Sequence, residues 1–251
     1  MNKFDSIRPY EDSEVEAVLS SLSSNANVIR ALIDSFDSNL ISLLPFKEKI
    51  ISLYLKHKTK NITSIHEYQN LFESIVSNVV TQSINNLSVS GLENLDKNKG
   101  YLFISNHRDI TLDSALLNLK LHQSGFQTTN NAVGNNLMNE SWASDIMRLN
   151  KSFIIDRSDK SKRDIYKSLN LASEFICNSV LNKNESVWIA QKQGRSKDGI
   201  DFTDPTVLKM IHLSRRKLSR IDECFNNLNV VPVTISYEKT LMIYSKQESY
   251  I

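Results

Sequence analysis

The chain has 251 residues, of which 40% are hydrophobic and 23% charged, and its formal net charge is +2. This composition is typical of an ordinary soluble globular protein that is long enough to bury a sizeable core. The small net charge gives no reason to expect nucleic acid as a partner, and two cysteines without a Cys-x-x-Cys spacing argue against a disulfide framework and a structural zinc site.

Residues 1–86 are expected to form a helical region. One helix is predicted to begin at Asp12, and a second apolar pattern runs from 27 to 55, with Pro45 breaking or kinking it. A third helix is predicted over 64–84. The segment 27–46 is aliphatic with few charges. It could pack against the core, which we favour, or lie in a membrane interface.

From residue 87 the pattern changes, because short apolar runs alternate with longer helical stretches. This alternation is typical of a βαβ layer fold and predicts an α/β domain over residues 87–238. The expected strands are 101–105, 129–134, 152–156, 186–190 and 230–236, and the expected helices are 110–121, 138–149, 160–181 and 205–219. Residues 239–251 do not continue the pattern, and we expect an aberrant or truncated tail there.

The first strand of this domain leads directly into a candidate general base. His107 follows the apolar run and a Ser-Asn pair, with Asp109 and Asp113 two and six positions later. Open α/β folds expose reactive side chains at the carboxyl ends of strands, and a His held by a carboxylate is suited to proton transfer near neutral pH. Asp109 directly precedes a helical pattern and is interpreted as its N-cap, so Asp113 is the preferred partner; the sequence leaves both open.

Three later segments repeat this arrangement of an apolar run that ends in polar or basic residues. Arg157 comes just after the strand at 152–156, and Gly194-Arg195-Ser196 lies in a polar turn after the strand at 186–190. Arg is suited to forked recognition of phosphate. The last strand contains Pro232, which suits an edge strand or a bulge because proline has no N–H to donate.

Taken in order, these four segments resemble the four motifs of the glycerophospholipid acyltransferase family, and the resemblance spans residues 101–238. The first resembles a His-x4-Asp motif, although five residues separate His107 from Asp113. The second resembles Phe-Ile-x-Arg and the fourth a Val-Pro-Val strand. The third resembles Glu-Gly-x-Arg-Ser, with Gln193 where the family has Glu and one residue fewer before Arg195.

The resemblance implies an α/β fold with a mixed sheet flanked by helices, and a fatty acyl transfer in phospholipid synthesis that uses no metal or cofactor. The acyl donor would be acyl-CoA or acyl-carrier protein, and the acceptor a hydroxyl of glycerol 3-phosphate or 1-acylglycerol 3-phosphate. His107 would act as general base and Asp113 would orient it. Substrate binding would fall to Asn106, Arg157, Gly194, Arg195, Ser196 and Pro232.

The sequence also bears on location and on competing functions. No apolar leader follows Met1 and no apolar run approaches about 20 residues, which predicts a cytoplasmic protein without a spanning helix. Basic clusters at 160–163 and 215–220 suit an anionic membrane, so we expect peripheral contact at the inner face of the cell membrane. The alternatives are a truncated, inactive lipid-binding pseudoenzyme and a thioesterase-like hydrolase.

Overall fold

The computed structural model describes residues 2–35, 46–137, 140–156, 158, 161–196 and 200–237. The expected site residue Arg157, the expected helix break at Pro45 and the expected tail at 239–251 lie outside the described residues. The helices of the N-terminal region are α1 (Asp12–Leu22), α2 (Ala26–Ser35), α4 (Lys47–Thr59) and α5 (Ile65–Ser83).

Local capping explains where two of these helices begin. At the start of α5, the Ser64 side chain accepts a hydrogen bond from the backbone of Glu67, and the Glu67 side chain accepts from the backbone of Ser64. At the start of α1, the Glu14 side chain accepts in the same way from the backbone N–H of Glu11 at 2.8 Å. These bonds satisfy backbone N–H groups that have no partner within the helix. The helices predicted from Asp12 and over 64–84 are therefore confirmed.

The α/β prediction is confirmed by a five-stranded sheet of order β3-β2-β4-β1-β5. The strands are β1 (Leu102–Ser105), β2 (Asn130–Gly134), β3 (Ser152–Ile155), β4 (Val187–Ala190) and β5 (Val230–Val233). We expected a mixed sheet, but every strand pairing among the described residues is parallel. The reason is that helices separate successive strands, so no strand returns through a hairpin.

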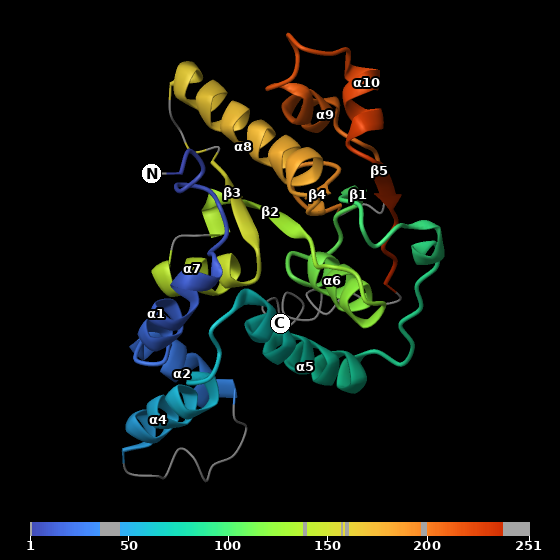
Figure 1. Ribbon diagram of the computed structural model, residues 1–251. Helices are drawn as coiled ribbons and strands as arrows, with labels where there is room; N and C mark the ends of the chain where they lie inside the picture. Colours follow the sequence, from blue (N-terminus) through green and yellow to red (C-terminus); the bar gives the residue numbers. More distant parts are fainter. Residues whose placement is uncertain are drawn as a thin grey trace, which may run out of the picture.

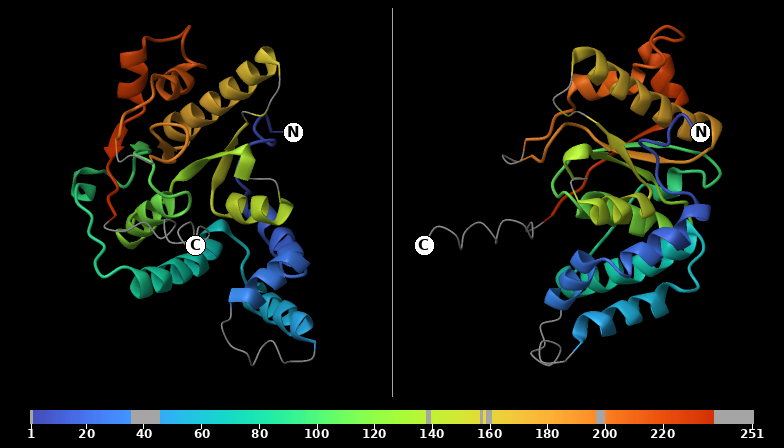
Figure 2. Two further views of the ribbon diagram at one scale, coloured as in Figure 1. Left: turned by 180° about the vertical axis from the view of Figure 1, so that it is seen from behind. Right: turned by 90° about the vertical axis from the view of Figure 1, so that its left-hand side faces the viewer.

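Helices cover both faces of the sheet (Figures 1 and 2). The helices α8 and α9 lie on one side, and α6 and α7 on the other, with α1, α2 and α4 beyond α7 and α5 below α6. The connecting helices are α6 (Leu112–Gln123), α7 (Ser141–Leu149), α8 (Lys162–Asn182), α9 (Pro205–His212) and α10 (Ile221–Asn227).

Two expected elements end earlier than their apolar patterns suggested. The helix predicted over 205–219 ends at His212, and turns lead from there to α10, which the sequence pattern did not indicate. The strand predicted over 230–236 ends at Val233. Beyond it, the backbone N–H and C=O of Ile235 bond to the side chain of Asn106 instead of a neighbouring strand. Tertiary contacts therefore override the continuing apolar pattern.

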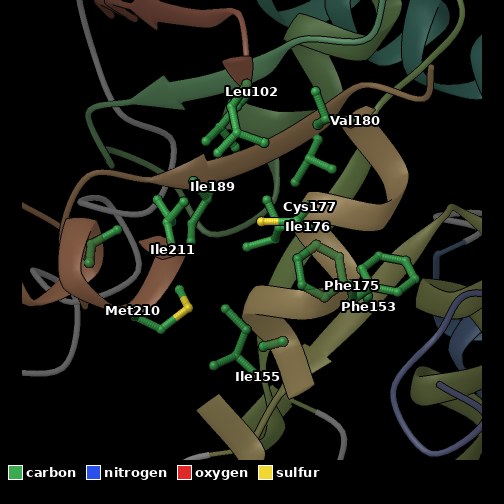
Figure 3. Close-up of a cluster of buried hydrophobic side chains, with 14 of the residues drawn as sticks. Leu102, Phe153, Ile155, Phe175, Ile176, Cys177, Val180, Ile189, Met210 and Ile211 are labelled. Atoms are coloured by element: carbon green, nitrogen blue, oxygen red, sulfur yellow. The ribbon is translucent and has the colours of Figure 1, made fainter. Parts of the chain in front are cut away.

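The largest buried cluster lies between the sheet and helices α8 and α9 (Figure 3). Leu102, Phe153 and Ile176 are fully buried in it. On the opposite face, Phe103 and Trp188 pack with residues of α6. Because both faces are covered, β1, β3 and β4 are mostly apolar, as their short apolar runs predicted, whereas β2 begins with the buried polar residues Asn130 and Asn131. No helix in the described parts of the chain is long and apolar enough to cross a membrane.

Candidate active site

The carboxyl ends of three adjacent strands bring the candidate site together. Ser105, the last residue of β1, lies between Ala190 of β4 and Val233 of β5 in the strand register. The segments that follow these strands therefore emerge side by side. Two backbone hydrogen bonds join the first two segments: Gln191 N–H donates to the Ser105 carbonyl at 2.7 Å, and Ser196 N–H donates to the His107 carbonyl at 2.8 Å.

His107 and Asp113 form the central pair of this site. Asp113 lies in the first turn of α6 and its side chain is completely buried, whereas the His107 side chain is 16% exposed. The His107 Nδ1 atom lies 2.8 Å from Asp113 Oδ2. The backbone N–H groups of Arg108 and Asp109 donate to the same oxygen at 2.8 and 3.1 Å.

This geometry defines the tautomer of His107. An ionised carboxylate only accepts hydrogen bonds, so the Nδ1 atom must carry the proton that it donates to Asp113. The neutral ring then keeps its free electron pair on Nε2. The arrangement can therefore accept a proton at Nε2, and the charged ring that results is stabilised by the buried carboxylate.

Asp109 does not contact the imidazole in this structure. Its Oδ1 atom accepts hydrogen bonds from the backbone N–H groups of Thr111 and Leu112, each at 2.9 Å. Thr111 is the N-cap residue of α6 and makes no side-chain capping bond of its own. Asp109 thus has the capping role expected from the sequence but stands two residues earlier than a standard N-cap.

Tyr237 is a further partner of Asp113. Its hydroxyl donates to Asp113 Oδ1 at 2.8 Å, so both carboxylate oxygens have donors. Burial and the negative charge of Asp113 raise the pKa of the Tyr237 phenol above its usual range. The phenol therefore stays protonated and remains a donor at neutral pH.

The Asn106 side chain, an expected substrate contact, bonds to the backbone of a distant segment. Its Oδ1 accepts from Ile235 N–H at 2.8 Å, and its Nδ2 donates to the Ile235 carbonyl at 2.9 Å. Asp201, which the sequence analysis did not single out, accepts from Asn106 Nδ2 at 3.2 Å and pairs with Arg108 at 2.5 Å. These bonds position Tyr237, two residues after Ile235, beside Asp113.

The segment after β4 contains the other expected site residues. Gly194 has a φ of +75°, and a Cβ atom there would meet no atom within 4 Å, so its constraint is the backbone conformation. The Ser196 hydroxyl donates to the Ile200 carbonyl at 2.7 Å. Arg195 is half-buried, and no described residue forms an ion pair with its guanidinium.

A family model described as Acyltransferase matches residues 86–236. The chain belongs to the Acyltransferase family, that of the glycerophospholipid acyltransferases. The match covers more than half of the chain and includes the whole sheet and the segments that carry His107, Asp113 and Arg195. No curated protein sequence matches the chain.

The remaining expected residue of this acyltransferase is Pro232, which lies in the middle of β5. It is paired with Ile104 in the strand register, and β5 is at the edge of the sheet, one of the two positions that the sequence predicted for a strand with an internal proline. Pro232 is exposed, and its missing N–H is tolerated because β5 has a neighbouring strand on one side only. Among the described residues, no group of three His, Cys, Asp or Glu side chains is placed to hold a metal ion.

An apolar cavity of about 370 Å³ extends to the start of α6, the helix whose first turn carries Asp113, although neither His107 nor Asp113 lines it. It is enclosed by α5, α6, α7 and the adjoining strands. Ile110 and Ser114, which flank the start of α6 next to Asp113, are among its lining residues. The apolar wall includes Phe72, Val76, Ala115, Leu119, Val133 and Ile146. The sequence analysis did not predict this cavity, because its wall combines residues from distant segments.

Proposed function

We propose that this acyltransferase moves a fatty acyl group from acyl-CoA or acyl-carrier protein to a hydroxyl of glycerol 3-phosphate or 1-acylglycerol 3-phosphate, a step of phospholipid synthesis. The observation that carries the proposal is the His107–Asp113 pair, at the end of β1 and beside a loop that presents Arg195. An alcohol is a weak nucleophile, and a positioned general base is what it requires.

The reaction proceeds by direct transfer. His107 Nε2 takes the proton from the acceptor hydroxyl while the hydroxyl oxygen bonds to the thioester carbonyl carbon. The C–S bond then breaks, and the thiolate takes the proton back from the imidazolium. Asp113 stabilises the imidazolium between these steps. A cysteine nucleophile is not available, because burial raises the pKa of both thiols, that of Cys224 to about 11, and keeps them protonated.

The acceptor phosphate would bind at the loop after β4, through Gly194, Arg195 and Ser196. Arg157 is proposed as a further contact of the acceptor, and Pro232 as a contact of the acyl donor.

Replacing Arg195 with alanine is expected to lower kcat/KM for the acceptor roughly 10- to 150-fold, mostly through KM, because a hydrogen bond to a charged group contributes about 1.5–3 kcal/mol. Acceptor titrations of the two proteins measure this. Arg220→Ala, which removes an exposed arginine elsewhere, is the matched control; equal losses in both variants would contradict the role of Arg195.

The apolar cavity is suited to the fatty acyl chain. Its wall is mostly hydrocarbon and it reaches Ser114, the neighbour of Asp113. A chain buried there is withdrawn from water, while its thioester end lies toward His107.

The decisive experiment is the release of free CoA from palmitoyl-CoA by the full chain, with glycerol 3-phosphate, with 1-acylglycerol 3-phosphate and with neither. Acceptor-dependent release supports the proposal and names the acceptor. Release that is undiminished without acceptor indicates the thioesterase alternative. A folded protein that releases neither CoA from palmitoyl-CoA nor free acyl-carrier protein from its palmitoyl thioester, with either acceptor, indicates the inactive alternative.

Tyr237 is expected to act as a positioning residue for this reaction. Tyr237→Phe should lower kcat by roughly 2- to 10-fold. This loss is smaller than the contribution typical of a hydrogen bond to a charged group, because Asp113 keeps three other hydrogen-bond donors. Losing the Oδ1 donor leaves the carboxylate a stronger acceptor for the imidazolium, so the acidic limb of the pH–rate profile should move to higher pH.

The matched control is Tyr10→Phe, which removes a tyrosine hydroxyl bonded to Asp145 at 2.7 Å, away from the site. It should leave the pH–rate profile unchanged. A purely structural role for Tyr237 would lower stability in Tyr237→Phe without moving the acidic limb, and that result would refute the positioning role.

The proposed acceptors and donors also suggest where the enzyme works. An acylated glycerol phosphate is an anionic amphiphile that resides in a bilayer, so we place the enzyme at the cytoplasmic surface of the cell membrane, in peripheral contact with anionic lipid.

A further inference from the structure

Helix α4 presents an apolar stripe to solvent. Phe46, its N-cap residue, is 81% exposed, and Ile50, Leu53 and Tyr54 are 47%, 58% and 52% exposed. Positions spaced by three and four residues lie on one face of a helix, so these four side chains form a single stripe. Contiguous exposed apolar side chains of this size mark interaction surfaces.

Positive charge accompanies the stripe. Residues 46–60 contain five lysines and one glutamate. Lys47 and Lys58 lie on one flank of the stripe by helical spacing, and Lys49, Lys56 and Lys60 on the other. The Lys58 Nζ atom lies 5.8 Å from the centre of the Tyr54 ring. Long lysine stems can extend toward a polar layer while the stripe between them enters an apolar one.

The opposite face of α4 is fixed to the protein. Ile51 is buried, and the Ser52 hydroxyl donates to the Ser23 carbonyl at 2.7 Å. The helix packs against α1 and α2. This packing keeps the stripe pointing outward. Figures 1 and 2 show α4 at the lower end of the described molecule, away from the sheet, where a broad surface can reach it.

We infer that the stripe Phe46, Ile50, Leu53 and Tyr54 is the surface by which the protein docks on an anionic phospholipid bilayer. The apolar stripe enters the headgroup–acyl boundary and the flanking lysines contact lipid phosphates. The inference rests on the proposed function, since a lipid substrate explains why the protein would bind a membrane. The exposure and charge of α4 identify which surface binds it. Helix α5, which lines the apolar cavity, lies toward the same lower side of the molecule.

A second basic surface is the strongest competitor. Residues 215–221 contain exposed Leu218 and Ile221 among arginine and lysine side chains, but only two apolar residues are exposed there, against four on α4. The acidic residues Asp222 and Glu223 follow directly and oppose an anionic surface. Charge complementarity and apolar area therefore both favour α4.

Flotation of the full chain with vesicles tests the docking surface. The vesicles are phosphatidylcholine alone and an equal mixture of phosphatidylcholine and phosphatidylglycerol. The unmodified protein should float with the mixed vesicles, and less with phosphatidylcholine or at high salt. Ile50→Ser/Leu53→Ser should lower vesicle affinity roughly tenfold per side chain, and Lys49→Glu/Lys56→Glu by at least about fivefold per lysine.

Two matched variants on the competing surface serve as controls. Leu218→Ser/Ile221→Ser and Lys217→Glu/Arg220→Glu should float like the unmodified protein. Circular dichroism melts confirm that each variant is folded. The inference is overturned if the unmodified protein does not float with the mixed vesicles, if both α4 variants float normally, or if only the controls lose binding. A dimer that Ile50→Ser/Leu53→Ser abolishes, with no flotation, would make a second copy the occupant instead.

Flotation requires no turnover, so its failure is distinct from failure of the proposed function. With glycerol 3-phosphate and no vesicles, Ile50→Ser/Leu53→Ser should release CoA like the unmodified protein. Flotation without acceptor-dependent CoA release would retain the docking surface and refute the proposed reaction.

Discussion

Replacing His107 with alanine is expected to lower kcat for acceptor-dependent CoA release on the order of 10²–10⁴-fold, the contribution typical of a general base. Without the imidazole, no side chain replaces His107 Nε2 as the base for the substrate hydroxyl, because Asp113 lies on the Nδ1 side of the ring. The KM for the acceptor should change little, since the proposed phosphate contacts lie on the loop after β4.

The measurement is steady-state kinetics with both substrates varied. His66→Ala is the matched control, because His66 is an exposed histidine on α5, away from the His107–Asp113 pair, and it should retain the activity of the unmodified protein. If folded His107→Ala kept acceptor-dependent activity within a few-fold of the unmodified protein, His107 would not be the base and the proposed mechanism would fail.

Replacing Asp113 with asparagine is expected to lower kcat on the order of 10²-fold or more, at nearly unchanged KM. The amide has the same size and can keep an oxygen toward the backbone N–H groups of Arg108 and Asp109. It carries no charge, however, and so does not stabilise the imidazolium that forms when His107 accepts a proton. The expected loss is therefore catalytic, and thermal melts should show that the variant still folds.

Asp109→Asn is the matched control for Asp113→Asn. Its side-chain oxygen can still accept from Thr111 and Leu112, so activity should remain close to that of the unmodified protein. Asp109→Ala, which removes the acceptor, should cost about 0.5–2 kcal/mol of stability, as the loss of a helix cap does. A larger kinetic loss in Asp109→Asn than in Asp113→Asn would assign the orienting role to Asp109.

The apolar patterning of the sequence was sufficient to locate the strands. Each of the five predicted strands overlaps an observed one; β1, β2, β3 and β4 each differ from the predicted range by one residue, and β5 ends three residues earlier than predicted. This works because a strand buried on both faces needs a continuous apolar run, which is a local property. The same runs place His107 and Arg195 after strands β1 and β4. The order of the strands, and hence the meeting of these segments, is not local.

The features that escaped the sequence depend on contacts between distant segments. Tyr237 reaches Asp113 across 124 positions, and Asn106 bonds to Ile235 across 129. The resemblance implies substrate contact for Asn106, and the structure adds that its amide bonds to the Ile235 backbone, which the sequence could not show. The fully parallel sheet likewise follows from the helical crossovers, where a mixed sheet was expected.

The sequence by itself determined the α/β class, the helical N-terminal region and the chain position of the candidate base, since these follow from local apolar periodicity and side-chain chemistry. Only the tertiary structure decided that Asp113 and not Asp109 contacts His107, because a one-residue departure in spacing is absorbed by the turn before α6. The apolar cavity and the exposed stripe of α4 are likewise visible only in the tertiary structure, since the burial of a side chain depends on what packs against it and not on the side chain alone.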